Sequence, residues 1–266
     1  MTKSLLASAA LLVLLPAHAE ISVTSAAFTY GESFDSLTTT TGTAVAWAND
    51  STLAGWSLFT KDGNPITTYG ADNGGSNTGS FRSYGSTGSA ERALGGAASG
   101  GAYFGSPATG AVAGWIAAAF TNNSGSTLGG FSVAYDGEQW RNGGNASAQT
   151  MVMEYGFGTS FGSVALWTAP GGMADFSSPV VGTTAGAVDG NALGLLTGLG
   201  TSVGSLDWAP GETLWVRFTE RNDAGADHGL AVDNFAFSVG VVPEPQTWAL
   251  MLAGAAALGF MVRRRG

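Results

Sequence analysis

Any chemistry performed by this chain would depend on carboxylates, because imidazole and thiol groups are scarce. There is no cysteine among the 266 residues, and the two histidines are His18, near the N-terminus, and His228. Thiolate zinc sites, cysteine nucleophiles and disulfide scaffolds are therefore excluded. A Ser-His-Asp triad in the body of the chain would have to use His228. Within Asp227-His228-Gly229 we interpret this residue as a hydrogen-bonded loop histidine.

Two glutamates, Glu138 and Glu154, are candidates for a glycosidase pair. Such chemistry needs two carboxyl groups about 5 to 9 Å apart across one cleft, one of them with a raised pKa. The separation of the two residues along the sequence does not decide this. Glu138 also stands beside Trp140 and Arg141, which fits a structural ion pair next to a packed tryptophan. The glycosidase hypothesis is therefore kept as an alternative.

Clustered oxygen ligands suggest a second kind of site, one for calcium. Residues 222–227, Asn-Asp-Ala-Gly-Ala-Asp, gather hard oxygen ligands around a glycine, as a calcium-binding loop would. The segment lacks the twelve-residue EF-hand pattern, and a cluster of Asn, Asp and Gly between two strands is also typical of a hairpin turn. Both interpretations stay open at this point.

The eight tryptophans suggest sugar binding, because a flat indole ring can stack on a pyranose. Five of them lie in strand-like segments, where we expect core packing: Trp47, Trp56, Trp115, Trp140 and Trp167. Trp215 alternates out of phase with Leu214, Val216 and Phe218, so it is expected to face the other side of its sheet. Trp215 and Trp208 are predicted to form an exposed aromatic platform for a ligand.

The charge balance of the body argues against nucleic acid as a partner. Charged residues make up 11% of the chain, and residues 20–242 hold six basic and eighteen acidic groups, a net charge of −12. Such a surface repels a phosphate backbone. It is compatible with calcium or with a neutral polysaccharide.

The pattern of the body predicts an all-β domain over residues 20–240. Apolar residues alternate with polar ones at 131–135, 151–155, 214–219 and 232–237, and turn clusters rich in Gly, Asn and Pro separate such segments. There is no long amphipathic helix and no repeat of fixed period, so a solenoid or propeller is not expected. We predict a two-sheet β-sandwich of jelly-roll type. Residues 70–88, rich in Gly, Ser and Asn, are expected to form long loops.

The N-terminal residues 1–19 have the pattern of a secretory signal peptide. Lys3 provides the positive start, residues 5–15 are apolar, and Ala17-His18-Ala19 is the small-x-small pattern accepted by signal peptidase. We expect the mature chain to begin at Glu20.

The C-terminal residues 241–266 combine a stiff linker, an apolar segment and a basic end. The parts are Val242-Pro243-Glu244-Pro245, Trp248 followed by an apolar run at 249–262, and Arg263-Arg264-Arg265. The prolines keep the linker extended and accessible, and the tryptophan suits a membrane interface. Residues 248–262 are predicted to form a single transmembrane helix, with the arginines in the cytoplasm by the positive-inside rule.

These C-terminal features closely resemble the PEP-CTERM sorting signal of Gram-negative bacteria. The resemblance covers about the last 25 residues: the Pro-Glu-Pro triplet, the Trp-Ala-Leu-Met-Leu-x-Gly opening of the helix and the arginine cluster. It implies export, temporary anchoring in the inner membrane and processing by an exosortase near Pro243-Glu244-Pro245. Such proteins commonly accompany exopolysaccharide production, which suggests a role at the cell surface or in a biofilm.

A second resemblance concerns the body, on three segments: residues 32–37, residues 135–141 and residues 217–235. They are similar to a β-sandwich module found in many exported bacterial proteins, which implies an accessory or adhesive role and no catalytic residue. In jelly-roll carbohydrate modules a structural calcium often links an aspartate of the last strand to acids near the first. That resemblance makes Glu32, Asp35 and Asp233 the candidate calcium ligands.

The sequence thus favours a non-enzymatic, exported β-sandwich with signal peptidase, exosortase and the inner membrane as partners, and exopolysaccharide as a further one. A carbohydrate-binding module is the first alternative and a glycosidase the second.

Overall fold

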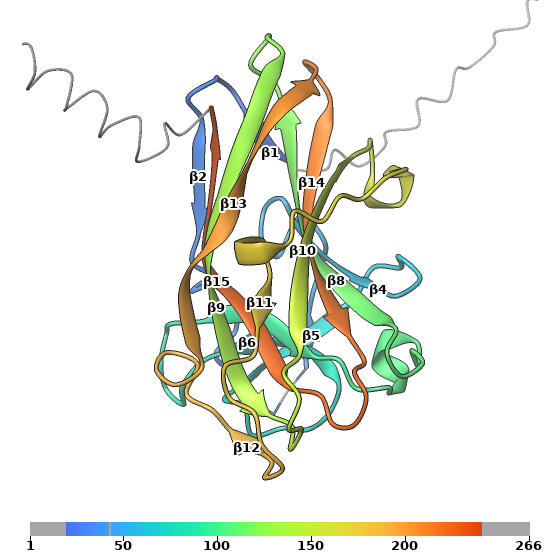
Figure 1. Cartoon of the computed structure of the whole chain (residues 1–266), viewed down its shortest axis with the longest axis vertical. Coiled ribbons are helices and arrows are strands. Elements are labelled where there is room, and N and C mark those ends of the chain that lie inside the picture. The colour runs from blue at the N-terminus through green and yellow to red at the C-terminus, as the bar shows by residue number, and fades with distance from the viewer. Residues whose placement is uncertain (1–19, 43, 241–266) are drawn as a thin grey trace, which may run out of the picture.

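The computed structural model describes residues 20–42 and 44–240 as an all-β body (Figure 1). The expected signal peptide, the segment from 241 onward and the expected membrane helix at 248–262 lie outside the described residues. Across 20–42 and 44–240, the helices are short 3₁₀ turns, and no helix has the length and apolar character of a membrane span. These turns are η1 (Ala102–Phe104), η2 (Phe161–Ser163) and η3 (Gly172–Ala174).

The first sheet has the strand order β1-β8-β14-β10-β11, with β4 also paired to β8. Its strands are β1 (Ile21–Val23), β4 (Trp56–Thr60), β8 (Val112–Asn122), β10 (Thr150–Phe157), β11 (Phe176–Ser177) and β14 (Thr213–Arg221). All the pairs are antiparallel except β1 with β8, which is parallel. The first and last thirds of the chain thus share one sheet.

The second sheet has the order β12-β9-β15-β7-β6-β5-β3, with β13 also on β9 and β2 also on β15. Its strands are β2 (Thr29–Glu32), β3 (Val45–Ala46), β5 (Thr68–Asp72), β6 (Ser80–Tyr84), β7 (Ala93–Ala97), β9 (Leu128–Asn142), β12 (Gly186–Ala187), β13 (Leu195–Trp208) and β15 (Gly229–Val239). The prediction of loops at 70–88 is wrong in part, because the end of β5 and all of β6 lie there. Pairing with β7 supplies the backbone partners that the local composition does not reveal.

The core lies between the two sheets and is built by strand alternation. Phe131, Val133 and Tyr135 of β9 face the same apolar layer as Val216 and Phe218 of β14. The rings of Tyr135 and Phe218 meet edge to face, with centroids 5.0 Å apart. This one core contains buried residues from position 21 to position 239, and the predicted two-sheet sandwich is confirmed.

Each sheet also packs side chains on its outer face. On the first sheet, Trp215 joins Phe59 and Phe161 in a second apolar cluster, and the last two rings stack with centroids 4.0 Å apart. On the second sheet, Trp140 and Tyr84 belong to a third cluster. Loops therefore cover part of both outer faces, which creates dry environments outside the central core.

Candidate functional site

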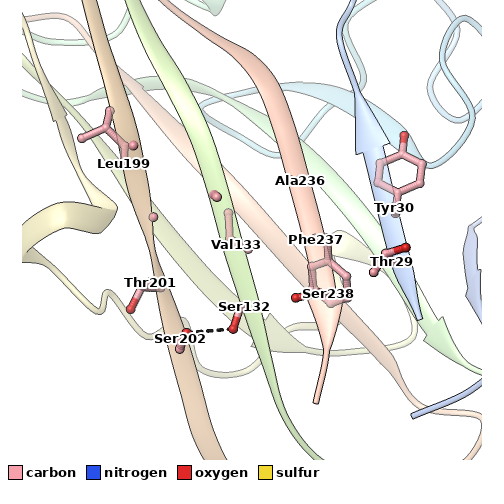
Figure 2. A pocket seen from close by; sticks show the side chains of 13 residues that line it. Thr29, Tyr30, Ser132, Val133, Leu199, Thr201, Ser202, Ala236, Phe237 and Ser238 are labelled. Carbon is pink, nitrogen blue, oxygen red and sulfur yellow. Dashed lines mark hydrogen bonds between the residues drawn. The ribbon is translucent and has the colours of Figure 1, made fainter. Parts of the chain in front are cut away.

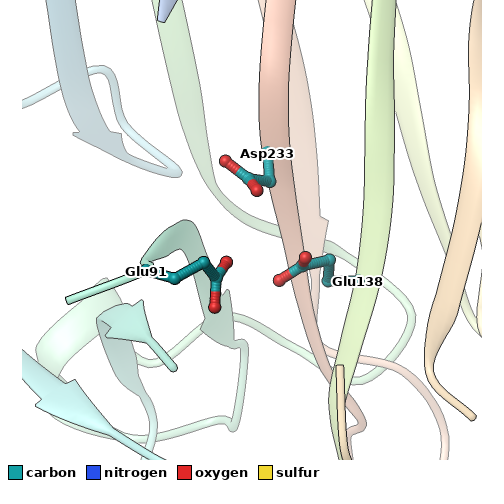
Figure 3. Close-up of side chains that lie close together, drawn as sticks. All are labelled: Glu91, Glu138 and Asp233. Atoms are coloured by element: carbon teal, nitrogen blue, oxygen red, sulfur yellow. The ribbon is translucent and has the colours of Figure 1, made fainter. Parts of the chain in front are cut away.

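Three carboxylates come together on the outer face of the second sheet: Glu91, Glu138 and Asp233, here called the acidic cluster (Figure 3). Glu138 lies on β9, Asp233 on the neighbouring β15, and Glu91 in the segment that leads into β7. One oxygen from each residue lies within 4.8 Å of the others. Three segments far apart in the sequence thus contribute to one site.

Strand register explains why two of these side chains are neighbours. In the β9–β15 ladder Glu138 is opposite Ala231, and Asp233 is opposite Asp136 two positions along. Residues two apart on a strand share a face, so the carboxylates of Glu138 and Asp233 are diagonal neighbours. The register shifts just after Asp233, where Asn234 has a φ of 47°. This bulge lets Asp233 point outward although Phe235 and Phe237 return to the core.

Two of the three carboxylates in the acidic cluster are almost closed to solvent, and Glu91 is partly exposed. Glu138 is 1% exposed and Asp233 3% exposed. The indole Nε1 of Trp140 donates to Oε2 of Glu138 over 2.8 Å, and the side-chain amide of Asn191 donates to Oε2 of Glu91. Oε1 of Glu91 and Oδ1 of Asp233 are buried and make no hydrogen bond. Two carboxylate oxygens therefore remain to be satisfied.

Burial dominates the electrostatics of the cluster. It raises the pKa of Glu138 to about 8; the bond from Trp140 opposes that rise, and repulsion by Asp233, Glu91 and Asp136 adds to it. Burial also raises the pKa of Asp233 to about 7; the backbone N–H of Asn234 opposes the rise, and nearby carboxylates reinforce it. Each acid thus keeps its proton to a higher pH than an ordinary carboxyl group does, unless a cation replaces the proton.

The nearby cation, Arg92, is directed elsewhere. Its Nε donates to Oγ of Ser83 over 2.8 Å, and its Nη2 donates to the Ser83 carbonyl. Arg92 is 2% exposed, and its burial lowers the pKa of the guanidinium. The arginine therefore offsets part of the negative potential without bonding to the three carboxylates.

The predicted calcium ligands Glu32, Asp35 and Asp233 are only partly brought together. Oε1 of Glu32 accepts the backbone N–H of Phe34 over 2.8 Å, and Oδ1 of Asp35 accepts that of Arg92 over 3.0 Å. Asp233 lies with Glu91 and Glu138 instead. Alternation along residues 136–140 could have indicated Glu138, whereas no local pattern marks Glu91, which comes from a loop.

The second candidate calcium segment, residues 222–227, forms the loop between β14 and β15. The backbone N–H of Asp223 donates to Oδ1 of Asp227 over 2.8 Å, which closes the loop on itself. Burial raises the pKa of Asp227 to about 7 and that of neighbouring Glu220 to about 8. β14 belongs to the first sheet and β15 to the second, so this loop connects the two sheets and the hairpin-turn interpretation is wrong.

His228 is held by backbone groups, as interpreted from the sequence. Its Nδ1 accepts the N–H of Gly143 over 3.0 Å, and its Nε2 lies 3.3 Å from the carbonyl of Ser147. The sequence also contains two Gly-x-Ser-x-Gly stretches, centred on Ser160 and Ser202. Ser202 instead shares a hydrogen bond with Ser132, over 2.7 Å, and Ser160 caps η2. The imidazole is thus committed to backbone partners.

The two glutamates of the glycosidase hypothesis lie on different sheets. Glu138 belongs to the outer face of the second sheet, beside Trp140. Glu154, on β10, accepts a hydrogen bond from Nε of Arg217 over 2.7 Å and forms an ion pair with its Nη2 over 2.7 Å, on the outer face of the first sheet. The central core separates these faces, so the structure does not bring Glu138 and Glu154 together across a cleft.

The expected exposure of Trp208 and Trp215 is not found. Trp208 is 0% exposed and donates through Nε1 to the Glu212 carbonyl, whereas Trp215 is 7% exposed and donates to the Gly158 carbonyl. Trp215 does face away from the central core, as its phase indicates. The loop after β10 covers it, and Trp215 and Phe161 line a cavity of about 200 Å³.

An open groove of about 440 Å³ crosses β2, β15, β9 and β13 on the outer face of the second sheet (Figure 2). One side is a row of hydroxyls set by register: Ser238 pairs with Thr29 and with Ser132, and Ser132 pairs with Ser202. In the next row of paired residues, Ala236, Ala134 and Gly200 have small side chains or none, which leaves space above the sheet and forms the floor of the groove. Sequence periodicity did not predict this groove, because it depends on which strands are neighbours.

Comparison with known proteins identifies the C-terminal segment. Residues 241–265 match the PEP-CTERM protein-sorting motif, which confirms that prediction. No curated protein matches the chain. Among solved structures, TmCBM61 in complex with beta-1,4-galactotriose shares 9% identity over 57% of this chain and 72% of that one, with a TM-score of 0.25.

Proposed function

We propose that this is an exported protein, held temporarily at the inner membrane of a Gram-negative cell and then processed by an exosortase. The observation that carries the proposal is the PEP-CTERM motif at residues 241–265. The last strand of the sandwich, β15, ends at Val239, which is already part of the core. Cleavage near Pro243-Glu244-Pro245 would therefore release the sandwich with its core complete.

The beginning of the sandwich supports export in the same way. β1 begins at Ile21, and Oε2 of Glu20 accepts a hydrogen bond from Oγ1 of Thr213 over 3.2 Å. Removal of residues 1–19 by signal peptidase after Ala17-His18-Ala19 would leave these contacts intact. Both processing events would thus fall just outside the folded body.

The proposal is tested by following a tag placed after Glu20 through cell fractionation. The wild-type protein should pass from the inner membrane to the cell surface or medium. Mass spectrometry of the released protein should show Glu20 as its N-terminus and the loss of the arginine cluster. Replacing Pro243, Glu244 and Pro245 by alanine should retain the longer form in the membrane. Pro210→Ala, in an exposed turn of the sandwich, is the matched control. A full-length protein in the cytosol would contradict the proposal.

We further propose that the sandwich, of jelly-roll type, has no catalytic role and acts in the extracellular matrix with exopolysaccharide. The separation of Glu138 and Glu154 and the backbone contacts of His228 support this. The exported protein should release no reducing ends from polysaccharides of the producing strain. Hydrolysis that is lost in Glu138→Gln or Glu154→Gln would support a glycosidase instead.

A second candidate function, carbohydrate binding, is favoured by the hydroxyl-lined groove. Hydroxyl side chains can both donate to and accept from the hydroxyl groups of a neutral sugar. The groove spans four strands, which gives room for more than one sugar unit, and its row of Thr29, Ser238, Ser132 and Ser202 is polar but uncharged. This would explain an association with exopolysaccharide without catalysis.

Affinity electrophoresis of the exported protein in gels containing exopolysaccharide tests this second function. Ala134 is exposed on the floor of the groove, and Ala134→Trp should fill it and remove retardation. Ala165, exposed on a loop over the other sheet, gives the control Ala165→Trp, which should bind as the wild type does. Equal retardation of both variants would exclude the groove as the binding site.

A further inference from the structure

We propose that the acidic cluster of Glu91, Glu138 and Asp233 binds a divalent cation, and that Ca²⁺ is the ion it fits. Neither export nor carbohydrate binding in the groove requires this site. It would be a structural cation site that ties together β9, β15 and the segment before β7.

The unsatisfied oxygens point to a missing ligand. Asp233 is 3% exposed, yet its Oδ1 makes no hydrogen bond. Oε1 of Glu91 is also buried and also makes no hydrogen bond. Figure 3 shows the carboxylates of Glu91 and Asp233 turned toward the space beside Glu138. A buried polar oxygen without a partner is costly, so native proteins usually satisfy such a group. A cation shared by the three residues would satisfy both oxygens at once.

The chemistry of the ligands selects a hard cation. All three are carboxylates, and residues 20–266 contain no cysteine and a single histidine, His228, which is bonded elsewhere. Carboxylate oxygens suit calcium, whose oxygen ligands lie about 2.3–2.6 Å away. Two oxygens on one calcium ion can thus be up to about 4.6–5.2 Å apart. The observed limit of 4.8 Å between the oxygens of the acidic cluster fits this span.

The charge of the surroundings also favours a cation. Asp35 and Asp136 add to the negative potential at Asp233, and Asp136 adds to that at Glu138. Arg92 interacts electrostatically with Glu91 and Glu138, but its guanidinium donates hydrogen bonds to Ser83. A divalent ion would offset the repulsion among the three carboxylates that the charge of Arg92 does not cancel.

Thermal unfolding and calorimetry on the full-length protein in mild detergent test the site. After treatment with a chelator, Ca²⁺ alone is added, at pH 8, where the carboxylates ionise most readily. At a hundredfold excess over Kd the unfolding temperature should rise by roughly 5 to 10 °C. The rise should be smaller at pH 6, because calcium must then displace protons.

Nearly isosteric variants locate the binding. Asp233→Asn and Glu138→Gln should weaken calcium binding by about tenfold or more, since each removes a charged ligand. Without calcium they should unfold at no lower temperature than the wild type, because they also remove repulsion. If either fails to fold, Glu91→Gln, at a partly exposed position, is expected to weaken binding equally.

The control is Asp136→Asn, on the same strand and face as Glu138 but outside the acidic cluster. It removes a nearby charge but no ligand, so it should weaken calcium binding by no more than about threefold, well short of the tenfold or more expected when a ligand is lost. Absence of both binding heat and a temperature shift in the wild type would overturn the proposal. It would also be overturned if Asp136→Asn lost as much affinity as Asp233→Asn, because binding would then reflect general negative charge.

Discussion

The indole Nε1 of Trp140 donates a hydrogen bond to Oε2 of Glu138 over 2.8 Å, although both residues lie on the outer face of their sheet. Both are 1% exposed. Tyr84 lies parallel to the indole with centroids 6.2 Å apart, and the loop at Gly190 approaches so closely that a Cβ there would meet the ring at 2.3 Å. This part of the outer face is therefore buried like a core, and Glu138 of the acidic cluster lies in a largely water-free environment.

Removing the indole donor should destabilise the protein more at high pH than at low pH. In Trp140→Phe, Glu138 loses its donor, and the loss matters most when the carboxylate is charged, above its pKa of about 8. A hydrogen bond to a charged group contributes about 1.5–3 kcal/mol, against about 0.5–1.5 for a neutral one. Urea unfolding should therefore show that the loss of unfolding free energy in Trp140→Phe is about 1 kcal/mol larger at pH 9 than at pH 6.

The matched control for this prediction is Trp47→Phe. Trp47 is also buried, and its Nε1 donates over 2.7 Å to the neutral side-chain oxygen of Asn49. Its cost should not change between the two pH values. If both variants show the same pH dependence, the charge on Glu138 is not the cause.

In the absence of divalent cations, the protein should be more stable at pH 5 than at pH 8. The pKa values of Glu138 and Asp233 are raised in the folded state to about 8 and about 7, from 4.5 and 3.8. Between about pH 4 and pH 8 the folded state therefore holds more protons than the unfolded state, and the free energy of unfolding falls as pH rises. Urea titrations in a chelator measure this slope.

Asp233→Asn should make that slope shallower, because it removes one of the raised groups. Asp62→Asn is the control, since Asp62 is an exposed residue whose side chain is paired with Lys61. An unchanged slope in Asp233→Asn would show that the acidic cluster does not govern the pH dependence.

The imidazole of His228 should remain neutral below the pH at which an ordinary histidine is protonated. Burial lowers its pKa from 6.5, and protonating Nδ1 would break its bond from Gly143. A group with a lowered basic pKa stabilises the folded state above the unfolded pKa, and this contribution falls as pH drops below about 6.5. Residues 20–266 contain one histidine, so the ¹⁵N imidazole signals of the mature protein are unambiguous. Titration at or above pH 6.5 would contradict this prediction.

Replacing Arg217 by lysine should destabilise the first sheet. The guanidinium lies 3.7 Å from the ring centroid of Trp167 and 4.7 Å from that of Trp115, and it contacts Glu154 through two nitrogens. Lysine keeps the charge but has no planar group to stack or to bond twice. We expect Arg217→Lys to lower the free energy of unfolding by about 1–2 kcal/mol.

Arg221→Lys serves as the control, because Arg221 is exposed and donates to the carbonyl of Gly110. Urea unfolding followed by tryptophan fluorescence should show little change in this variant. An equal loss in both variants would mean that the stacking around Arg217 contributes nothing specific.

Several features of the protein were determined by the sequence alone. The alternation at 131–135 and 214–218 predicted which residues face the core, because side chains alternate between the faces of a strand whatever its partner. The sorting motif at 241–265 was also predicted, since its parts follow one another along the chain. His228 was correctly expected to be hydrogen bonded.

Only the tertiary structure decided which residues meet. Glu91 joins Glu138 and Asp233 because β9, β15 and β7 are neighbours in the second sheet, and the sequence contains no local record of that order. Phase correctly placed Trp215 on the face away from the core, yet the loop carrying Phe161 covers it. Periodicity shows on which face of a strand a side chain lies. It does not show what packs on that face, because contacts between residues far apart in the sequence decide this.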